Sequence, residues 1–196
     1  DCYARLAPAL DTHPFARVED VGLLSRESEH DRPWLAARLG LDPTRRWCLV
    51  YVGADGIRGI DWRRLAAFRD WEFLGLYPLP GAPGNYHRIT MAPDFGYADL
   101  TAASDVVLGK LGYGLVSECL HLARPVVFPP RALFREHALL ADAVVSRGLG
   151  RELSLADLCA LDIGAALEWA VTVRVTPLPA PAGDRIVALI DRARRR

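Results

Sequence analysis

Continuous apolar runs and mixed polar stretches alternate along the middle of this 196-residue chain. Short apolar runs bounded by turn residues predict strands that are covered on both faces. Such runs occur at residues 47–52, 72–76, 87–91, 106–108 and 126–128. Stretches with helical periodicity lie between them, at residues 31–39, 61–68, 97–103, 115–123 and 136–147. This alternation over short loops predicts an α/β fold, a doubly wound, Rossmann-like parallel sheet with right-handed crossovers.

The two ends of the chain differ from this middle part. Residues 1–38 hold several turn residues and a weak apolar run, and are predicted to be an interdomain connecting segment with no regular strand. Residues 39–176 form the predicted domain and close with a helical pattern at 155–171. Residues 177–196 are predicted to hold a C-terminal helix behind a proline-rich stretch. Because position 1 is Asp, we expect a fragment of a longer protein.

Composition excludes several classes of protein. The formal net charge is zero and the pI is near 7.1, which argues against nucleic acid as the main partner. No apolar stretch approaches the roughly 20 residues of a membrane span, and no secretory segment opens the chain, so we expect a cytoplasmic protein without a transmembrane segment. The cysteines form no C-x-x-C pair and the histidines no H-E-x-x-H motif, so we expect no metal site.

The most informative stretch runs from Ser104 to Pro130. It predicts a strand, a glycine loop that contains Lys110, a helix that carries Glu118, and a second strand that ends in two prolines. Glycines let a backbone approach a ligand closely, and the free N–H groups at a helix start favour phosphate. In an open α/β sheet, ligands bind outside the carboxyl ends of the strands, where the segments 53–56, 110–114 and 129–137 are expected.

Each residue of this loop also has a purely structural interpretation. Lys110 is the only lysine among 24 basic residues, which suggests that a compact point charge is required there, although it can equally be a solvated loop residue. Gly112 and Gly114 flank Tyr113 and favour close ligand approach, or they only provide positive φ in a turn. Glu118 either accepts both hydroxyls of a ribose or complements the helix dipole.

Two further segments are weaker candidates. The turn from Gly53 to Gly56 follows the first strand and is a second contact for a diphosphate or an acceptor, although it lacks a full G-x-G-x-x-G motif and a Walker lysine. Arg131, Glu136 and His137 follow the fifth strand and can reach a sugar or simply open a solvated helix.

The pattern K-x-G-Y-G-x-V-S-E, followed by P-V-V-F-P and a helix that begins near E-H, resembles the carboxyl-terminal half of GT-B glycosyltransferases. The resemblance is to the MurG-like family, which includes the lipid-II-forming N-acetylglucosaminyl transferase. The segment 104–118 is more similar still to the glycosyltransferase-like domain that precedes the kinase in plant arabinokinases. The match extends from about residue 39 to residue 150 and is sharpest from 105 to 130.

This resemblance implies a site for a nucleoside diphosphate sugar and no other cofactor. Glu118 would hold the ribose, with Lys110 near the diphosphate. The backbone around Phe95 and Gly96 would face the base, and Glu136 or His137 the donor sugar. The remaining implied contacts are Gly53, Gly56, Gly112, Tyr113, Gly114, Ser117 and Arg131.

Two positions depart from the family pattern. Leu115 stands where the family often has Thr, and His137 where a glutamine is typical. The resemblance places the acceptor and the usual catalytic base in an amino-terminal half, so no catalytic residue is assigned in this chain. The implied function is a metal-independent transferase half that binds the sugar donor. A non-catalytic sugar-nucleotide-binding module, and an epimerase or hydrolase of the same fold, remain alternatives.

Overall fold

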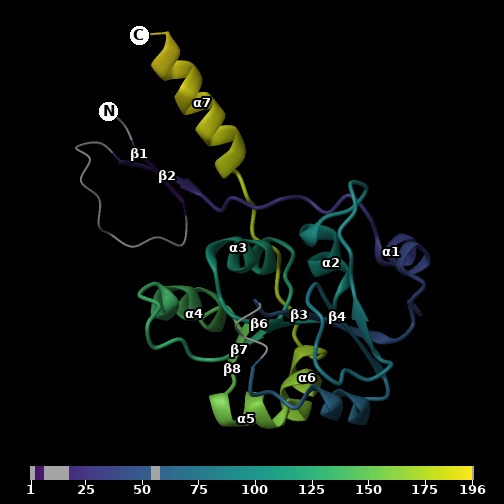
Figure 1. The fold of residues 1–196 in the computed structure, drawn as a ribbon. Coiled ribbons are helices and arrows are strands. Elements are labelled where there is room, and N and C mark those ends of the chain that lie inside the picture. Colours follow the sequence, from purple (N-terminus) through teal and green to yellow (C-terminus); the bar gives the residue numbers. More distant parts are fainter. Residues whose placement is uncertain (1–2, 7–17, 54–57, 196) are drawn as a thin grey trace.

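The computed structural model describes residues 3–6, 18–53 and 58–195, and its core is a six-stranded sheet (Figure 1). All neighbouring strands are parallel, in the order β5-β4-β3-β6-β7-β8. Counted from the first strand of this sheet, the order is 3-2-1-4-5-6, which is typical of doubly wound nucleotide-binding folds. The predicted fold class is confirmed. The strands are β3 (Arg46–Tyr51), β4 (Trp71–Gly75), β5 (Tyr86–Arg88), β6 (Val106–Gly109), β7 (Val126–Phe128) and β8 (Gly150–Glu152).

Helices cover both faces of the sheet, so the inner strands β3, β4, β6 and β7 are apolar on both sides (Figure 1). In β3, Trp47 and Leu49 pack into one hydrophobic cluster, while Cys48 and Val50 pack into the other. The first face carries α1 (Arg32–Leu39), α2 (Tyr97–Ala103), α3 (Tyr113–His121) and α4 (His137–Val145). The second face carries the 3-10 helix η2 (Trp62–Ala67), α5 (Leu155–Ala160) and α6 (Gly164–Ala170).

Local signals in the sequence set the ends of several helices. The Asp31 carboxylate accepts a hydrogen bond from the Trp34 N–H at 2.9 Å and caps α1. Gly40 ends this helix with a φ of 70°, a left-handed conformation that glycine adopts without strain. Gly148, with a φ of 69°, closes the turn after α4 in the same way.

Three elements differ from the sequence prediction. The strand β8 was not predicted, because Gly150, Arg151 and Glu152 lack an apolar run and form a strand only by pairing with β7 at the edge of the sheet. The helical pattern at 155–171 is divided into α5 and α6, since Leu161 takes a left-handed conformation with a φ of 49°. The helix predicted at 61–68 is a 3-10 helix.

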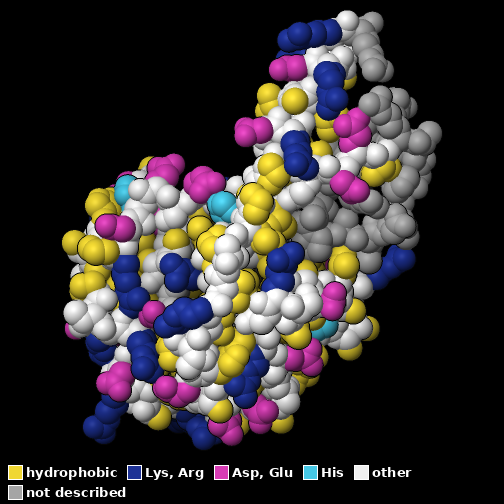
Figure 2. Space-filling model, turned by 180° about the vertical axis from the view of Figure 1, so that it is seen from behind, with side chains coloured by type: hydrophobic (Ala, Val, Ile, Leu, Met, Phe, Trp, Pro, Cys, Tyr) yellow, Lys and Arg dark blue, Asp and Glu magenta, His cyan; other side chains and the backbone are white. Residues whose placement is uncertain are grey.

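The N-terminal segment contains a parallel strand pair, β1 (Tyr3–Leu6) and β2 (Val18–Gly22). The prediction that no regular strand precedes residue 47 is therefore wrong, because strands this short are stabilised by a non-local partner and leave little periodic signal. The C-terminal helix α7 (Ala182–Arg194) lies beside β2, and together they project from the body of the domain (Figures 1 and 2). Glu19 and Arg192 form an ion pair at 3.4 Å between them.

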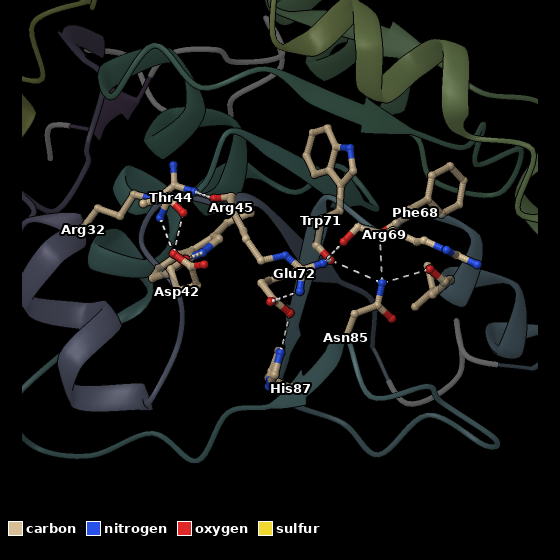
Figure 3. Close-up of polar contacts among 12 residues, drawn as sticks. Arg32, Asp42, Thr44, Arg45, Phe68, Arg69, Trp71, Glu72, Asn85 and His87 are labelled. Carbon is tan, nitrogen blue, oxygen red and sulfur yellow. Dashed lines mark hydrogen bonds and ion pairs between the residues drawn. The ribbon is translucent and has the colours of Figure 1, made fainter.

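A polar cluster joins the amino-terminal ends of β3 and β4, at the edge of the sheet away from the glycine loop (Figure 3). The buried Glu72 carboxylate forms an ion pair with Arg45 at 2.7 Å, and His87 Nε2 lies 2.6 Å from its other oxygen. Asn85 donates through Nδ2 to the carbonyls of Leu65 and Phe68 at 3.0 and 3.1 Å. These contacts satisfy polar groups at the strand starts, and we assign them a structural role.

The connecting segment is attached to α2 by one carboxylate. Asp99 Oδ1 accepts from the N–H groups of Glu29 and His30 at 2.7 and 2.9 Å and from Ser28 Oγ at 3.1 Å, while Oδ2 accepts from the Gly96 N–H at 2.7 Å. Burial opposes ionisation of this carboxyl, but the backbone hydrogen bonds outweigh it and hold the pKa of Asp99 below its ordinary value.

Replacing Asp99 by Asn is expected to lower the free energy of unfolding by about 1.5–3 kcal/mol at neutral pH, because several hydrogen bonds to a charged acceptor are weakened. The lowered pKa means that this contribution is present above the ordinary value of 3.8 and is lost as pH falls through the lower, folded value. Urea unfolding at neutral and acidic pH measures both effects. Asp94→Asn is the control, since its carboxylate pairs with Arg38 while half exposed. An equal cost for the two variants would contradict this role for Asp99.

Candidate functional site

The candidate site lies at the switch point of the sheet, where β3 and β6 are neighbours and later strands continue in opposite directions. Gly109 is opposite Tyr51 in this pair, and a Cβ at 109 would collide with the Tyr51 carbonyl. A Cβ at Gly53 would lie 2.8 Å from Lys110 Nζ. Both glycines therefore allow the exits of β3 and β6 to approach each other, and this places Gly53 beside the ammonium group of Lys110.

The helix α3 begins in a glycine loop that leaves its first turn uncapped by any side chain among the described residues. Gly112 is extended, with φ −150° and ψ 158°, and neither Gly112 nor Gly114 has a positive φ. A Cβ at either position would meet no atom within 4 Å. Neither backbone conformation nor packing therefore requires glycine here. Open space in front of free helical N–H groups is what the approach of an anion requires.

Lys110 is exposed at the end of β6, and no carboxylate among the described residues lies within ion-pair distance of it. It lines two clefts, both of which also contain Val52 and Gly53. One, of about 200 Å³, is lined by Tyr51, Tyr77 and Tyr97, and the other lies toward α5. An unpaired cation beside open space adds to the positive potential at the start of α3.

Glu118 is buried in the second turn of α3, with its side chain 8% exposed. Its Oε1 accepts from Arg26 Nη2 at 3.2 Å, and its Oε2 lies 3.5 Å from Thr101 Oγ1. Burial raises the pKa of this carboxyl, and the Arg26 charge opposes the rise. The helix dipole acts mainly on charges in the first turn, and Glu118 lies beyond it. The interpretation that Glu118 only complements the helix dipole is therefore less favoured.

Three tyrosines surround the smaller cleft next to Glu118. The rings of Tyr51 and Tyr97 meet edge to face at 5.2 Å between centroids. Burial, with the neighbouring Tyr51, Tyr77 and Glu118, raises the pKa of Tyr97 to about 12. Burial and Glu118 raise the pKa of Tyr51 as well. Both hydroxyls are therefore neutral at physiological pH and available as hydrogen-bond donors.

A further open cleft, of about 360 Å³, lies at the start of α2. Phe95 and Gly96 line it, together with Arg26 from the connecting segment. Phe95 is buried, and the Gly96 N–H already donates to Asp99 at 2.7 Å. Arg26 therefore connects this cleft with Glu118.

The remaining predicted residues are distributed around α3 and α4. Arg131 donates through Nη1 to the Leu111 carbonyl at 2.9 Å and so stabilises the loop that contains Lys110. Arg131 also lines the cleft toward α5. Tyr113 is 38% exposed at the helix start, and Ser117 is buried in the same helix. Gly56 lies outside the described residues.

Glu136 and His137 lie at the start of α4, farther from this group. Glu136 is the N-cap residue of that helix and supplies no side-chain cap. His137 packs edge to face against Phe128 and lies 3.6 Å from Glu152 on β8. Neither residue lines the three clefts described above. Their expected contact with the donor sugar stays a prediction.

Comparison with known proteins agrees with this fold. No protein-family model matches the chain. The L-arabinokinase of Arabidopsis thaliana is 38% identical over 162 residues, which cover 82% of this chain and 15% of the arabinokinase. The glycosyltransferase of kitacinnamycin has a TM-score of 0.55 at 22% identity, covering 79% of this chain and 41% of that enzyme. This chain has the fold of a GT-B glycosyltransferase domain. It resembles in sequence a segment of an arabinokinase.

Two further solved structures that match this GT-B-type domain contain a nucleoside diphosphate. The glycosyltransferase VinC, solved with dTDP, has a TM-score of 0.53 at 16% identity, covering 81% of this chain and 44% of VinC. MnaA of S. aureus, solved with UDP, has a TM-score of 0.57 at 14% identity, covering 82% and 48%. At such identities the likeness establishes the fold alone. The chain spans less than half of each solved neighbour and 15% of the arabinokinase.

Two other findings concern metal binding and membrane spanning. Among residues 3–6, 18–53 and 58–195, no group of three or more His, Cys, Asp or Glu is arranged to hold a metal ion. In the same part of the chain, no helix is both long enough and apolar enough to cross a membrane.

Sequence analysis missed several residues that surround Glu118. Arg26 lies 92 positions away in a segment without a motif, so nothing local indicated its contact with Glu118. Tyr51 belongs to the apolar strand predicted at 47–52, and Tyr77 directly follows the strand predicted at 72–76, so neither was assigned to the site. The one available signal is their position, since ligands bind outside the carboxyl ends of the strands in this fold.

Proposed function

We propose that this chain is the donor-binding domain of a GT-B glycosyltransferase and that it binds a nucleoside diphosphate sugar. The observation that carries the proposal is the buried Glu118 carboxylate behind the uncapped glycine start of α3, at the switch point of the sheet. A carboxylate can accept both hydroxyls of a ribose, and the helix start favours the attached phosphates.

In this proposal the ligand spans two of the clefts described above, the one lined by the three tyrosines and the one at the start of α2. The diphosphate lies against the N–H groups near Gly112 and Gly114, with Lys110 beside it. The ribose is at Glu118, where Arg26 moves aside or shares the carboxylate. The base occupies the cleft lined by Phe95 and Gly96. The neutral hydroxyls of the tyrosines donate hydrogen bonds to the ligand from the adjoining cleft.

The chemistry follows from where negative charge develops during transfer. When the sugar leaves, charge accumulates on the departing nucleoside diphosphate. Lys110 and the α3 N–H groups lie where they can stabilise it, which is the role that a metal ion has in other transferases. We therefore propose a metal-independent reaction. The acceptor and the catalytic base come from an amino-terminal domain, which is the partner that this half requires.

A second candidate is a sugar-nucleotide-binding module without transferase activity. The arabinokinase match favours it, because the similar segment is 15% of a protein named for a kinase activity. Fold alone does not separate transfer from epimerisation, because a putative UDP-N-acetylglucosamine 2-epimerase from Listeria monocytogenes and the kitacinnamycin enzyme match with the same TM-score, 0.55. The two candidates share the same pocket and differ in whether a sugar is transferred.

Calorimetric titration of the chain with UDP, GDP and dTDP, each with and without a chelator, tests the pocket. We expect one of the three to bind at least tenfold more tightly than its monophosphate, since the second phosphate adds a charge-assisted contact. Chelation is expected to leave this affinity unchanged. No binding by any diphosphate would refute the proposal, and loss of binding on chelation would refute metal independence. Turnover of the matching diphosphate sugar by the full-length protein separates a transferase from a binding module.

A further inference from the structure

The cleft on the α5 side of Lys110, called here the apolar cleft, is not explained by nucleotide-sugar binding. It has a volume of about 280 Å³ and lies where β3, β6 and β7 end, closed on one side by α5. Its walls are formed largely by apolar side chains, among them Ile60, Pro129, Pro130, Leu155 and Leu158. Tyr51, Tyr97 and Glu118, which line or adjoin the proposed nucleotide pocket, are not part of this lining.

Three cations line this apolar cleft, Arg58, Lys110 and Arg131, and no carboxylate among residues 3–6, 18–53 and 58–195 does. Within the described residues, neither Arg58 nor Lys110 forms an ion pair. Arg131 uses Nη1 for the Leu111 carbonyl and lies over the Phe134 ring at 3.9 Å, also without a carboxylate. Three cations without a carboxylate partner in the described part of the chain attract a dianion.

The apolar walls of the cleft determine which chemical group can be attached to the bound dianion. A hydroxyl group buried against Ile60, Leu155 and Leu158 would lose its hydrogen bonds to water without replacement, which disfavours a sugar in this space. An aliphatic group, in contrast, gains from leaving water. The volume of about 280 Å³ equals that of roughly nine water molecules at ~30 Å³ each, which accommodates a six-carbon chain while the phosphate contacts the exposed cations.

We propose that the apolar cleft is a second ligand site, which binds a phosphate monoester of a short aliphatic alcohol. The phosphate lies between Arg58, Lys110 and Arg131, and the chain lies against Leu155 and Leu158. The site goes beyond the proposed function, since its ligand makes no use of Glu118. Lys110 is common to both sites, so the two ligands are expected to influence each other there.

Hexyl phosphate, inorganic phosphate and 1-hexanol are the probes. Hexyl phosphate is expected to bind about tenfold or more tightly than either of the other two in calorimetric titration, because only it uses both the cations and the walls. Arg58→Ala and Leu155→Ser are each expected to weaken it severalfold. Both side chains are exposed, so these variants should fold normally. Leu133→Ser is the matched control, since Leu133 is fully exposed outside the cleft.

Cys159 provides an independent measurement, because it is an exposed free thiol in the lining of the cleft. Cys48 and Cys119 are buried, and burial raises the pKa of both thiols, so they should not react. In a Cys2→Ser background, hexyl phosphate is expected to slow alkylation of Cys159 at concentrations where inorganic phosphate does not.

Specific outcomes would overturn the second site. Equal affinities for hexyl phosphate and inorganic phosphate would remove the role of the apolar walls. Unprotected Cys159, or equal effects of Leu155→Ser and Leu133→Ser, would place the ligand elsewhere. Glu118→Gln should leave hexyl phosphate binding unchanged. These experiments can therefore refute the nucleotide-binding proposal without refuting the second site, or refute the second site alone, so the two failures are distinguishable.

Discussion

A Glu118→Gln chain is expected to bind nucleoside diphosphates about tenfold to a hundredfold more weakly than the wild-type chain, which corresponds to the 1.5–3 kcal/mol of hydrogen bonds to a charged group. Gln keeps the size of the side chain but has one carbonyl oxygen and no charge for two ribose hydroxyls. Isothermal calorimetry with the tighter of UDP and GDP, which both carry two ribose hydroxyls, measures the change. The effect is predicted to be large because Glu118 is buried, where an unsatisfied contact is costly.

A ligand pair makes this prediction specific for the ribose. The wild-type chain is expected to prefer the ribonucleoside diphosphate over its 2′,3′-dideoxy analogue, and Glu118→Gln is expected to lose that preference. A purely structural Glu118 would weaken both ligands equally. Thermal unfolding of both chains shows whether loss of the Arg26 contact alone accounts for the result. Retention of the ribose preference in the variant would exclude Glu118 from the site.

The affinity should also depend on pH through the same carboxyl. Burial raises the pKa of Glu118, so the ionised form that accepts hydroxyl donors is depleted when pH falls through that raised value. The difference between wild type and Glu118→Gln is therefore expected to shrink on acidification. The phosphates of the nucleotide also change protonation with pH, but they do so equally for both chains. Their contribution therefore cancels in the difference in affinity between wild type and Glu118→Gln.

Gly109→Ala is expected to lower the free energy of unfolding by about 1–3 kcal/mol, because the new methyl group collides with the Tyr51 carbonyl on the neighbouring strand. For a chain of this length that corresponds to a fall in Tm of roughly 3–10 °C. The strands β3 and β6 must separate at the switch point to relieve the contact. Since Lys110 follows directly, nucleotide binding is expected to weaken as well.

Gly84→Ala is the control for this variant. Gly84 is exposed, its φ is not positive, and a Cβ there would meet no atom within 4 Å. Its effect on stability is expected to stay within about 0.5 kcal/mol. Calorimetric unfolding of both variants tests the argument. If Gly109→Ala proved as stable as Gly84→Ala, close approach of the two strands would not be what positions the site.

The sequence alone determined the α/β class, the parallel sheet and the glycine start of α3. Apolar runs long enough to be buried on both faces mark β3, β4, β6 and β7, and capping residues such as Asp31 and Gly40 mark helix ends. These signals are local, because a strand or a cap is specified by residues that are neighbours in the chain. The weak elements β1, β2 and β8 escaped prediction, since each depends on a partner strand for its stability.

Only the tertiary structure decided which side chains meet at the site. The burial of Glu118, its contact with Arg26, and the tyrosines around the adjoining cleft join segments that are far apart in the chain. The structure also shows that neither Gly112 nor Gly114 has a positive φ. This favours ligand approach over turn geometry as the reason for the two glycines, and the sequence alone does not distinguish these explanations. Such features arise when strand order and helix packing bring distant residues together, and no periodic pattern records that arrangement.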